Sequence, residues 1–343
     1  MYKLDSISDC EITHYYDIKN GDSIFSRANK FWGCLNNLPF NFLIPQSKII
    51  RLFSKSRIFR RLSRLDKSNA VFNYNKDGII IIYNYKIYLF SLKNNNLKYI
   101  SNLNFRNVLH DGICVTAKGI YFGAYYSNKE RKSVPIYASY DDGYSWQIIA
   151  KLNSIRHVHS ICFDEYSKSL WISTGDLDGE CFLIKVPNEE FNNLVFYGDG
   201  SQSWRCVKLF FTKEKIIWAM DSPLKTSSLK LLDRKNGKLS TGFSFPGPVW
   251  YGKYLNDGFF VLQSTVEIGP SITTNKVKLF ISKDLIKWDE ILFFKKDFWP
   301  MPYFKFGVAS FSNGYQTSEL FCINLEGVKK LDGKSLFLSK DKI

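Results

Sequence analysis

The sequence predicts an all-β fold, a single β-propeller of about six four-stranded blades, with a count between five and seven. Three observations lead to this prediction: a repeat of about 45 residues, an Asp-box turn near the middle of the chain, and many aromatic residues. Aromatic residues make up 17% of the chain, and they favour strands over helices. A repeat of this length accommodates the four short strands of a propeller blade.

The repeat begins near residue 72 and is marked by five short apolar strands. They lie at residues 78–83, 119–123, 169–173, 215–219 and 258–262. One apolar residue of each strand serves as a marker: Ile81, Phe122, Trp171, Trp218 and Phe260. Successive markers are 41, 49, 47 and 42 residues apart. This nearly constant spacing indicates that each strand occupies the same place in its blade.

Each recurring strand is predicted to be the second of its blade. A strand and a turn come before it, at residues 114–119, 162–167, 207–214 and 253–258. A third strand with alternating residues follows, as at 135–139, 229–233 and 277–282, and then a fourth, as at 146–150 and 288–292. The strands near 306–311 and 319–323 are the least regular, which leaves the closure of the propeller open.

Residues 1–70 do not show the repeat, so they are predicted to form an N-terminal extension to a propeller at residues 71–343. Residues 47–65 predict a basic amphipathic helix, because Ile58, Leu62 and Leu65 recur at helical spacing while arginines fill the other faces. The preferred interpretation is that the apolar stripe docks on the propeller and the arginines form a solvated face. The helix could instead lie in an anionic lipid interface. Nucleic-acid binding is not expected, because no recognition motif accompanies the charge.

The chain has 47 Lys and Arg against 32 Asp and Glu, so a negatively charged partner is expected: nucleic acid, anionic lipid or an acidic glycan. Its seven cysteines are scattered and include no Cys-x-x-Cys pair, which is typical of free thiols in a reducing compartment. The first residues contain no apolar signal core, and no apolar run has the length of a membrane span. We therefore expect a cytoplasmic protein, with peripheral attachment to the inner membrane as an option.

The Asp-box pattern is carried by Ser139, Asp141, Gly143, Ser145 and Trp146. Asp141 can accept hydrogen bonds from its own turn, Gly143 permits a positive φ, and Trp146 packs between blades. Residues 282–288 are a degenerate second copy. The box is structural and occupies the turn between third and fourth strands. The opposite mouth of the propeller should then collect the starts of first strands and the ends of second strands.

Polar residues gather at those strand ends. We predict catalytic roles for a set of histidines and carboxylates: His110, Asp111, His157, His159, Asp176, Glu180 and Asp221. We predict substrate-binding roles for a second set: Arg156, Gln202, Trp204, Arg205, Tyr125 and Glu267. The two sets would converge on one mouth, where a propeller usually binds its ligand.

The histidines have alternative roles. His157 and His159 are two residues apart on a strand, so they point to the same side, and with His110 they could ligate a divalent metal. Proton transfer is the preferred role, because unperturbed histidine titrates near neutrality, and no cofactor is therefore expected. Trp204 has a structural alternative as well, since it could pack blade against blade instead of stacking on a sugar.

Several of these motifs resemble uncharacterised sialidase-like propeller proteins with BNR (Asp-box) repeats, a family often found with bacterial surface-polysaccharide genes. The likeness covers roughly residues 105–270 and rests on His110-Asp111-Gly112, Gly123-x-Tyr125-x-x-Asn128-x-x-Arg131, Arg156-His157-x-His159, Thr174-Gly175-Asp176-x-Asp178-x-Glu180-Cys181, Gly200-Ser201-Gln202-Ser203-Trp204-Arg205 and Asp221-x-Pro223. The resemblance implies a polysaccharide setting more than a mechanism. True sialidases are less similar, because they hold the substrate carboxylate with three arginines and carry an N-terminal Arg-Ile-Pro, whereas residues 43–45 here are Leu-Ile-Pro.

Together these features predict a carbohydrate-active propeller that acts on an acidic bacterial surface polysaccharide or its lipid-linked precursor. Arg156 and Arg205 would hold a uronate or a similar acid, and Trp204 would stack on a sugar. Two carboxylates about 5 to 9 Å apart would indicate hydrolysis. A His/Tyr pair beside an arginine-bound uronate would indicate a lyase instead. The alternative function is a non-catalytic glycan-binding or assembly protein at the inner membrane.

Overall fold

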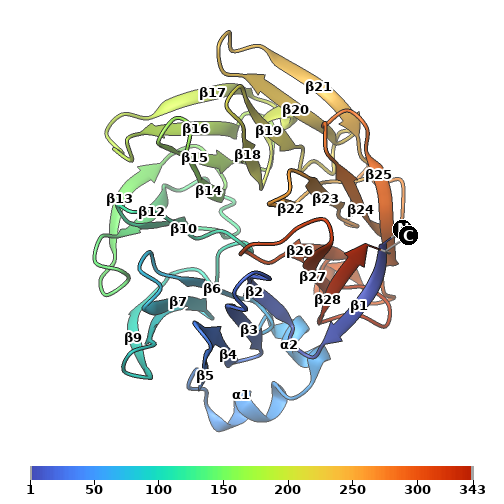
Figure 1. The fold of residues 1–343 in the computed structure, drawn as a ribbon. Coiled ribbons are helices and arrows are strands. Elements are labelled where there is room, and N and C mark those ends of the chain that lie inside the picture. The colour runs from blue at the N-terminus through green and yellow to red at the C-terminus, as the bar shows by residue number, and fades with distance from the viewer. Residues whose placement is uncertain (1, 341–343) are drawn as a thin grey trace. The chain divides into compact units, whose positions relative to one another are not determined.

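The computed structural model describes residues 2–340 and confirms the β-propeller class. Within this range the strands form seven four-stranded antiparallel sheets, the blades of the propeller, and the helices are few and short (Figure 1). Seven blades lie within the predicted range. The described chain divides into two compact units, one of residues 69–245 and one of residues 2–68 with 246–340.

The unit of residues 69–245 contains four blades, and the first begins at the unit boundary. The first two blades are β6 (Ser68–Phe72), β7 (Gly78–Tyr83), β8 (Lys86–Ser91) and β9 (Asn96–Asn102), then β10 (Cys114–Val115), β11 (Ile120–Gly123), β12 (Val134–Ser139) and β13 (Gln147–Leu152). The third blade is β14 (Val158–Asp164), β15 (Ser169–Thr174), β16 (Cys181–Pro187) and β17 (Val195–Gly200). The fourth follows the short 3-10 helix η1 (Gln202–Trp204) and is β18 (Leu209–Phe211), β19 (Lys215–Ala219), β20 (Ser228–Asp233) and β21 (Leu239–Ser244).

The other unit contains three blades and three short helices within the described residues. Two blades are continuous in sequence: β2 (Ile12–Tyr16), β3 (Ser23–Arg27), β4 (Lys30–Leu35) and β5 (Leu38–Leu43), then β22 (Gly252–Tyr254), β23 (Phe260–Ser264), β24 (Lys276–Ser282) and β25 (Asp289–Lys295). The last blade combines β26 (Val308–Phe311), β27 (Leu320–Glu326) and β28 (Lys334–Lys340) with β1 (Tyr2–Ser8). The helices are α1 (Lys48–Phe53), α2 (Arg57–Ser63) and α3 (Met301–Phe304).

The five recurring strands of the sequence repeat are β7, β11, β15, β19 and β23, and each is the second strand of its blade as predicted. The N-terminal prediction needs correction, because residues 1–70 are not an extension outside the propeller. Strands β2 to β5 form a complete blade, and β1 pairs antiparallel with β28 to complete another. The additional blade explains why the count is seven and not six.

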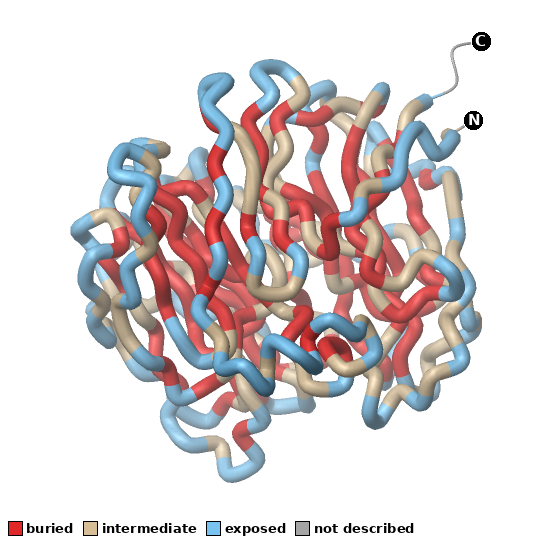
Figure 2. The backbone as a smooth tube through the Cα atoms, turned by 90° about the horizontal axis from the view of Figure 1, so that it is seen from below, coloured by how far each residue is buried: buried red, intermediate tan, exposed pale blue. Residues whose placement is uncertain are grey.

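The core of the unit of residues 69–245 consists of the apolar second and third strands of its blades. Ile80 and Ile82 of β7, Phe122 of β11 and Ile172 of β15 are fully buried in one continuous cluster. Figure 2 shows buried residues along the strands and exposed residues in the turns that connect them. The repeat was readable from the sequence because these fully buried strands form nearly continuous apolar runs.

The Asp box forms the turn between β12 and β13, the third and fourth strands of its blade, as predicted. The carboxylate of Asp141 accepts hydrogen bonds from the Ser139 hydroxyl at 2.8 Å and the Ser145 amide at 2.8 Å. Gly143 has a φ of 98°, and Trp146 packs against Phe122 with ring centroids 4.9 Å apart. The box therefore has the local structural role that its residue types indicate.

Replacing Gly143 with alanine is expected to destabilise the protein by about 2 to 4 kcal/mol, which combines left-handed strain with a steric clash. An added Cβ would lie 2.9 Å from a carbon of the Ile80 side chain. Gly237→Ala is the matched control, because Gly237 has a φ of 70° and no heavy atom within 4 Å of an added Cβ. Urea unfolding measures both variants, and an equal loss in the two would contradict the predicted clash.

A buried ion pair joins the third and fourth blades. Asp164, at the end of β14, is fully buried and accepts hydrogen bonds from two nitrogens of Arg234 at 2.7 and 3.0 Å. Burial alone would raise the pKa of Asp164, but the hydrogen bonds from Arg234 and Ser167 outweigh it and hold the pKa below its usual value. The carboxylate is therefore ionised in the folded protein at neutral pH.

This ion pair predicts a loss of stability in acid. Because the folded pKa of Asp164 lies below the unfolded value near 4, its contribution is complete above about pH 4 and is lost as the pH falls through the folded pKa. We expect Asp164→Asn to remove part of the pH dependence of the free energy of unfolding in this range. Glu165→Gln is the control, because Glu165 is the exposed neighbour of Asp164 and pairs with Lys168. This variant should leave the pH dependence of the free energy of unfolding unchanged.

The predicted basic helix is two short helices, α1 and α2, and its arginines do not form a solvated face. Ser47 caps the start of α1, and Ser56 caps the start of α2 and interrupts what the sequence pattern presented as one helix. Arg60 and Arg61 are buried, with exposed fractions of 3% and 1%. The predicted apolar stripe docks only at its end, since Leu65 is buried whereas Ile58 and Leu62 are about half exposed.

Acidic residues hold these arginines inside the unit. Arg60 pairs with Glu11 at 2.6 Å, and Arg57 reaches Glu11 and Asp66 at 3.0 and 3.1 Å. Arg61 pairs with Asp297 and donates to the carbonyl of Phe304 at 2.8 Å. The helix can thus direct these arginines inward because carboxylates pair with each of them, while Nη2 of Arg61 has no hydrogen-bond partner within the described residues.

All seven cysteines are free, as the sequence predicted, and five of them are buried. No helix within residues 2–340 combines the length and apolar character needed to cross a membrane.

Candidate functional site

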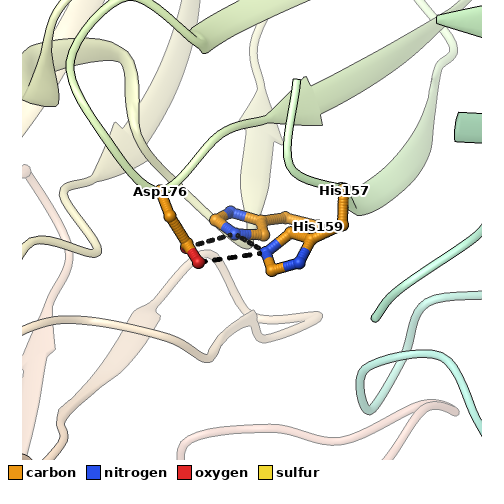
Figure 3. Close-up of side chains that lie close together, drawn as sticks. All are labelled: His157, His159 and Asp176. Atoms are coloured by element: carbon orange, nitrogen blue, oxygen red, sulfur yellow. Dashed lines mark hydrogen bonds and ion pairs between the residues drawn. The ribbon is translucent and has the colours of Figure 1, made fainter. Parts of the chain in front are cut away.

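The candidate site lies in the unit of residues 69–245 and is centred on Asp176, which follows β15. His157 and His159 come from the start of β14, the neighbouring strand of the same blade (Figure 3). Arg156 lies just before them. The two imidazole rings lie on the same side of the chain, with centroids 4.9 Å apart, as two residues of alternate position on a strand should. Arg205 and Asp221 come from the next blade.

Backbone carbonyls fix the orientation of both imidazoles. Nδ1 of His157 lies 3.0 Å from the carbonyl oxygen of Tyr126, and Nδ1 of His159 lies 2.9 Å from that of Cys206. A carbonyl can only accept, so both Nδ1 atoms carry hydrogen. Their Nε2 atoms face each other at 3.1 Å, and two lone pairs cannot meet at this distance without a cation between them. A single shared proton satisfies the pair.

The carboxylate of Asp176 balances the charge of this pair. Its Oδ1 lies 3.2 Å from Nε2 of His159, and its Oδ2 lies 3.5 Å from Nε2 of His157. Burial alone would raise the pKa of Asp176, but the interactions with His157 and His159 outweigh it and hold the pKa well below the usual range. Asp176 is therefore an anion at neutral pH.

Two arginines also contact Asp176. Arg156 pairs with Oδ2 at 2.9 Å and is about one-third exposed, whereas Arg205 pairs with Oδ1 at 3.1 Å and is nearly buried. Arg205 also donates to the backbone carbonyl of Asp176 at 2.8 Å. Arg156 thus presents its guanidinium toward solvent, while Arg205 holds the carboxylate from inside.

Asp221 is a second carboxyl group with the opposite pKa shift. It is buried, lies 3.3 Å from Nε of Arg205 and 3.9 Å from Nδ1 of His159, and its Oδ1 has no hydrogen-bond partner among the described residues. Burial raises the pKa of Asp221. Two carboxyl groups that share one guanidinium therefore differ in proton affinity, which is typical of acid–base sites.

The two histidines are not equivalent. Burial lowers the pKa of His157, and the nearby His159 lowers it further. With its pKa lowered, His157 holds a proton less readily than an ordinary imidazole, so its Nε2 is the acceptor in the pair. This makes His157 the candidate base, and the ring of Tyr125 lies against it with centroids 4.3 Å apart.

Gln202 fixes the loop that carries Asp176. Its side-chain amide donates to the Asp176 carbonyl at 3.0 Å and accepts from the Ser222 hydroxyl at 2.7 Å. Its backbone amide donates to Asp178 at 3.1 Å. Gln202 is fully buried, so it positions Asp176 and does not meet a substrate directly.

The structure brings together eight of the predicted site residues: Tyr125, Arg156, His157, His159, Asp176, Gln202, Arg205 and Asp221. Glu180, Asp111 and Trp204 have other partners. Glu180 forms two hydrogen bonds with Arg131, at 2.6 and 3.1 Å, and accepts from the Leu177 amide, which makes it an anchor of the 175–180 loop. Asp111 pairs with Lys208, and its neighbour His110 lies with it in the loop before β10.

Two residues that were predicted to bind the substrate, Trp204 and Glu267, have other surroundings in the structure. Trp204 packs on Trp218 with centroids 5.3 Å apart and covers the backbone of Gly198, which is the packing role considered from the sequence. Glu267 is buried after β23, in the unit of residues 2–68 with 246–340. The sequence did not reveal the carbonyls of Tyr126 and Cys206, because a backbone group leaves no signal in the residue type.

The search for known relatives gives no assignment: no protein-family model matches the chain, and comparison with curated proteins finds no match either. The resemblance to sialidase-like propellers therefore stays a prediction. What the site can do has to be argued from its own geometry.

A metal ion is the alternative to the shared proton. His157, His159 and Asp176 are the group in which ligand atoms lie within 4.8 Å of one another among residues 2–340, and His110 is not part of it. The two Nδ1–H···O=C bonds resemble the outer hydrogen bonds of metal-binding histidines. However, Arg156 and Arg205 already supply two positive charges to Asp176, and they oppose a divalent cation at the same carboxylate. A shared proton, which carries one positive charge, therefore fits these surroundings better than a divalent metal ion does.

Proposed function

We propose that the chain is a carbohydrate-active propeller that cleaves an acidic bacterial surface polysaccharide, or its lipid-linked precursor, by β-elimination next to a uronic acid. The observation that carries this proposal is the contact of His157 with both Tyr125 and Asp176, beside the part-exposed Arg156. The similarity to propellers from polysaccharide gene clusters supports the substrate class. The net charge of +15 supports an anionic substrate.

The chemistry assigns one role to each group. A guanidinium has five N–H donors, and Arg156 uses one of them for Asp176, so it can also bind the substrate carboxylate and neutralise its charge. Neutralisation makes the proton on the adjacent carbon removable. Nε2 of His157 takes this proton while the proton between the two imidazoles moves fully to Nε2 of His159, which donates to Oδ1 of Asp176 at 3.2 Å. The carbon–oxygen bond to the neighbouring sugar then breaks, and the Tyr125 hydroxyl donates a proton to the leaving oxygen. Asp176 stabilises the imidazolium that forms.

Elimination is favoured over hydrolysis by the burial of Asp221. Hydrolysis by the usual route requires two carboxyl groups that both reach the scissile bond. Of the two that contact the imidazoles, Asp176 is 14% exposed and Asp221 is almost fully buried. The pair therefore offers a substrate one carboxylate and not two.

A non-catalytic glycan-binding protein is the second candidate, and the burial of His157 and His159 favours it. In this case the two imidazoles would only hold Asp176 and Arg156 in place for binding. The seven free thiols support a cytoplasmic location for either function.

The test is an assay with oligosaccharides rich in uronic acids, in which the unsaturated product is followed by its ultraviolet absorbance. We expect turnover by the native chain and a loss of about 10²-fold or more in Tyr125→Phe and His157→Gln, with oligosaccharide affinity retained. Tyr166→Phe, at an exposed tyrosine on the turn after β14, is the control that should keep full turnover. Binding without turnover in the native chain would establish the binding function and exclude the lyase.

A further inference from the structure

The helices α1 and α2 present an apolar surface to solvent. Ile49, Leu52, Phe53, Ile58 and Leu62 have exposed fractions between 48% and 70%. We call these five side chains the apolar helix face. An ordinary surface helix turns such residues toward the core, and a contiguous exposed set of this kind marks an interaction site.

The inward arginines explain why the face points outward. Arg57, Arg60 and Arg61 are held by carboxylates inside the unit, so the opposite sides of the helices must face solvent. The rings of Phe53 and Phe59 stack with centroids 5.1 Å apart, which links α1 to α2 on this surface. Figure 1 shows α1 outside the strands of its unit, beyond β5.

The charged residues of the two helices have one sign. No Asp or Glu occurs between residues 47 and 65, and Lys48, Arg51 and Lys55 are exposed there. A second exposed aromatic group lies in the segment around α3, where Phe298 and Tyr303 are 82% and 67% exposed. This segment is tied to α2 because Arg61 donates to the carbonyl of Phe304.

We propose that the apolar helix face, flanked by Lys48, Arg51 and Lys55, docks on an anionic lipid bilayer. Helices that lie in a membrane interface insert apolar side chains at the boundary of the acyl chains and place lysine and arginine among the headgroups. Exposed Tyr and Phe are suited to the same interfacial region of the bilayer. A second copy of this chain does not fit the face, because two such surfaces would bring like charges together with no acid between them. This inference is independent of the reaction at Asp176.

The test is co-sedimentation of the full chain with vesicles of phosphatidylcholine alone or mixed with phosphatidylglycerol. We expect at least about tenfold tighter binding to the anionic vesicles, since each basic residue near the surface contributes to the attraction. The double variant Leu52→Ser with Phe53→Ser should lose binding to both, and Lys48→Glu with Arg51→Glu should lose the preference for anionic lipid. Ile148→Ser, at an equally exposed apolar residue of β13, is the matched control.

Three results would overturn the proposal. One is equal or absent binding to the two kinds of vesicle, and another is unchanged binding of both double variants. The third is a dimer, or a complex with an acidic protein, that the double variants abolish while vesicle binding persists. Because the charge variant alters only exposed residues, it keeps the test valid if the apolar variant unfolds.

Discussion

Replacing Glu11 with glutamine is expected to lower the free energy of unfolding by about 3 to 5 kcal/mol, because it removes one partner of a buried ionic cluster. Glu11 accepts hydrogen bonds from Arg60 and Arg57 and from the amide of Ala28. Burial alone would raise its pKa, but the two arginines outweigh burial and keep the pKa below the usual value. Without its charge, two guanidiniums remain close together with less compensation.

Asp9→Asn is the matched control for this experiment. Asp9 is two residues away and pairs with Lys334, but its side chain is 82% exposed. We expect no measurable change, since exposed pairs contribute little. Chemical denaturation gives the free energies, and equal stability of the Glu11 variant and the native chain would show that the inward arginines do not depend on Glu11.

Replacing Asp176 with asparagine is expected to reduce turnover of an acidic oligosaccharide by about 10² to 10⁴-fold. The amide keeps the shape of the carboxylate but not its charge, so the imidazolium formed on proton removal loses its counter-ion. Asp178→Asn is the control, because Asp178 is exposed and binds the Gln202 amide. We expect it to keep most of the activity.

A second measurement separates catalysis from structure at Asp176. Nitrogen chemical shifts of the imidazoles report which ring atoms carry protons. In the native chain we expect protonated Nδ1 in both histidines and one proton between the two Nε2 atoms. In Asp176→Asn the shared proton should be lost at a lower pH, because the anion that stabilises it is gone. Unchanged shifts and unchanged turnover together would contradict the assigned role.

The sequence predicted the blades of residues 71–343 well because their second strands are largely apolar, as in β7 and β19. It missed the blade of β2 to β5, whose strands carry more polar residues, such as Thr13 and His14. A signal was available in the two-residue turn between β4 and β5, where Asn36 and Asn37 have φ values of 51° and 63°. Two successive asparagines with positive φ are typical of a tight hairpin turn.

For the site, strand positions were enough to bring His157, His159 and Asp176 together, since each lies at or next to the end of a core strand. Strand positions did not reveal that Glu180 pairs with Arg131, because ion pairing depends on loop geometry. The helical periodicity of residues 47–65 likewise identified an apolar face and a basic face. It did not reveal which of the two faces points toward the protein interior. Hydrophobicity alone would turn the apolar face inward, and only the positions of Glu11 and Asp297 reverse it.

The pairing of β1 with β28 affects how the protein can be synthesised. Translation produces β1 first, while β28, which lies between β1 and β27 in the sheet, comes more than three hundred residues later. Until then a nascent chain carries two strand edges with unsatisfied backbone groups, and such edges readily capture strands of other chains. Folding of this blade is therefore delayed until β28 has been synthesised, and ribosomes that stall before residue 334 would release a product prone to aggregation.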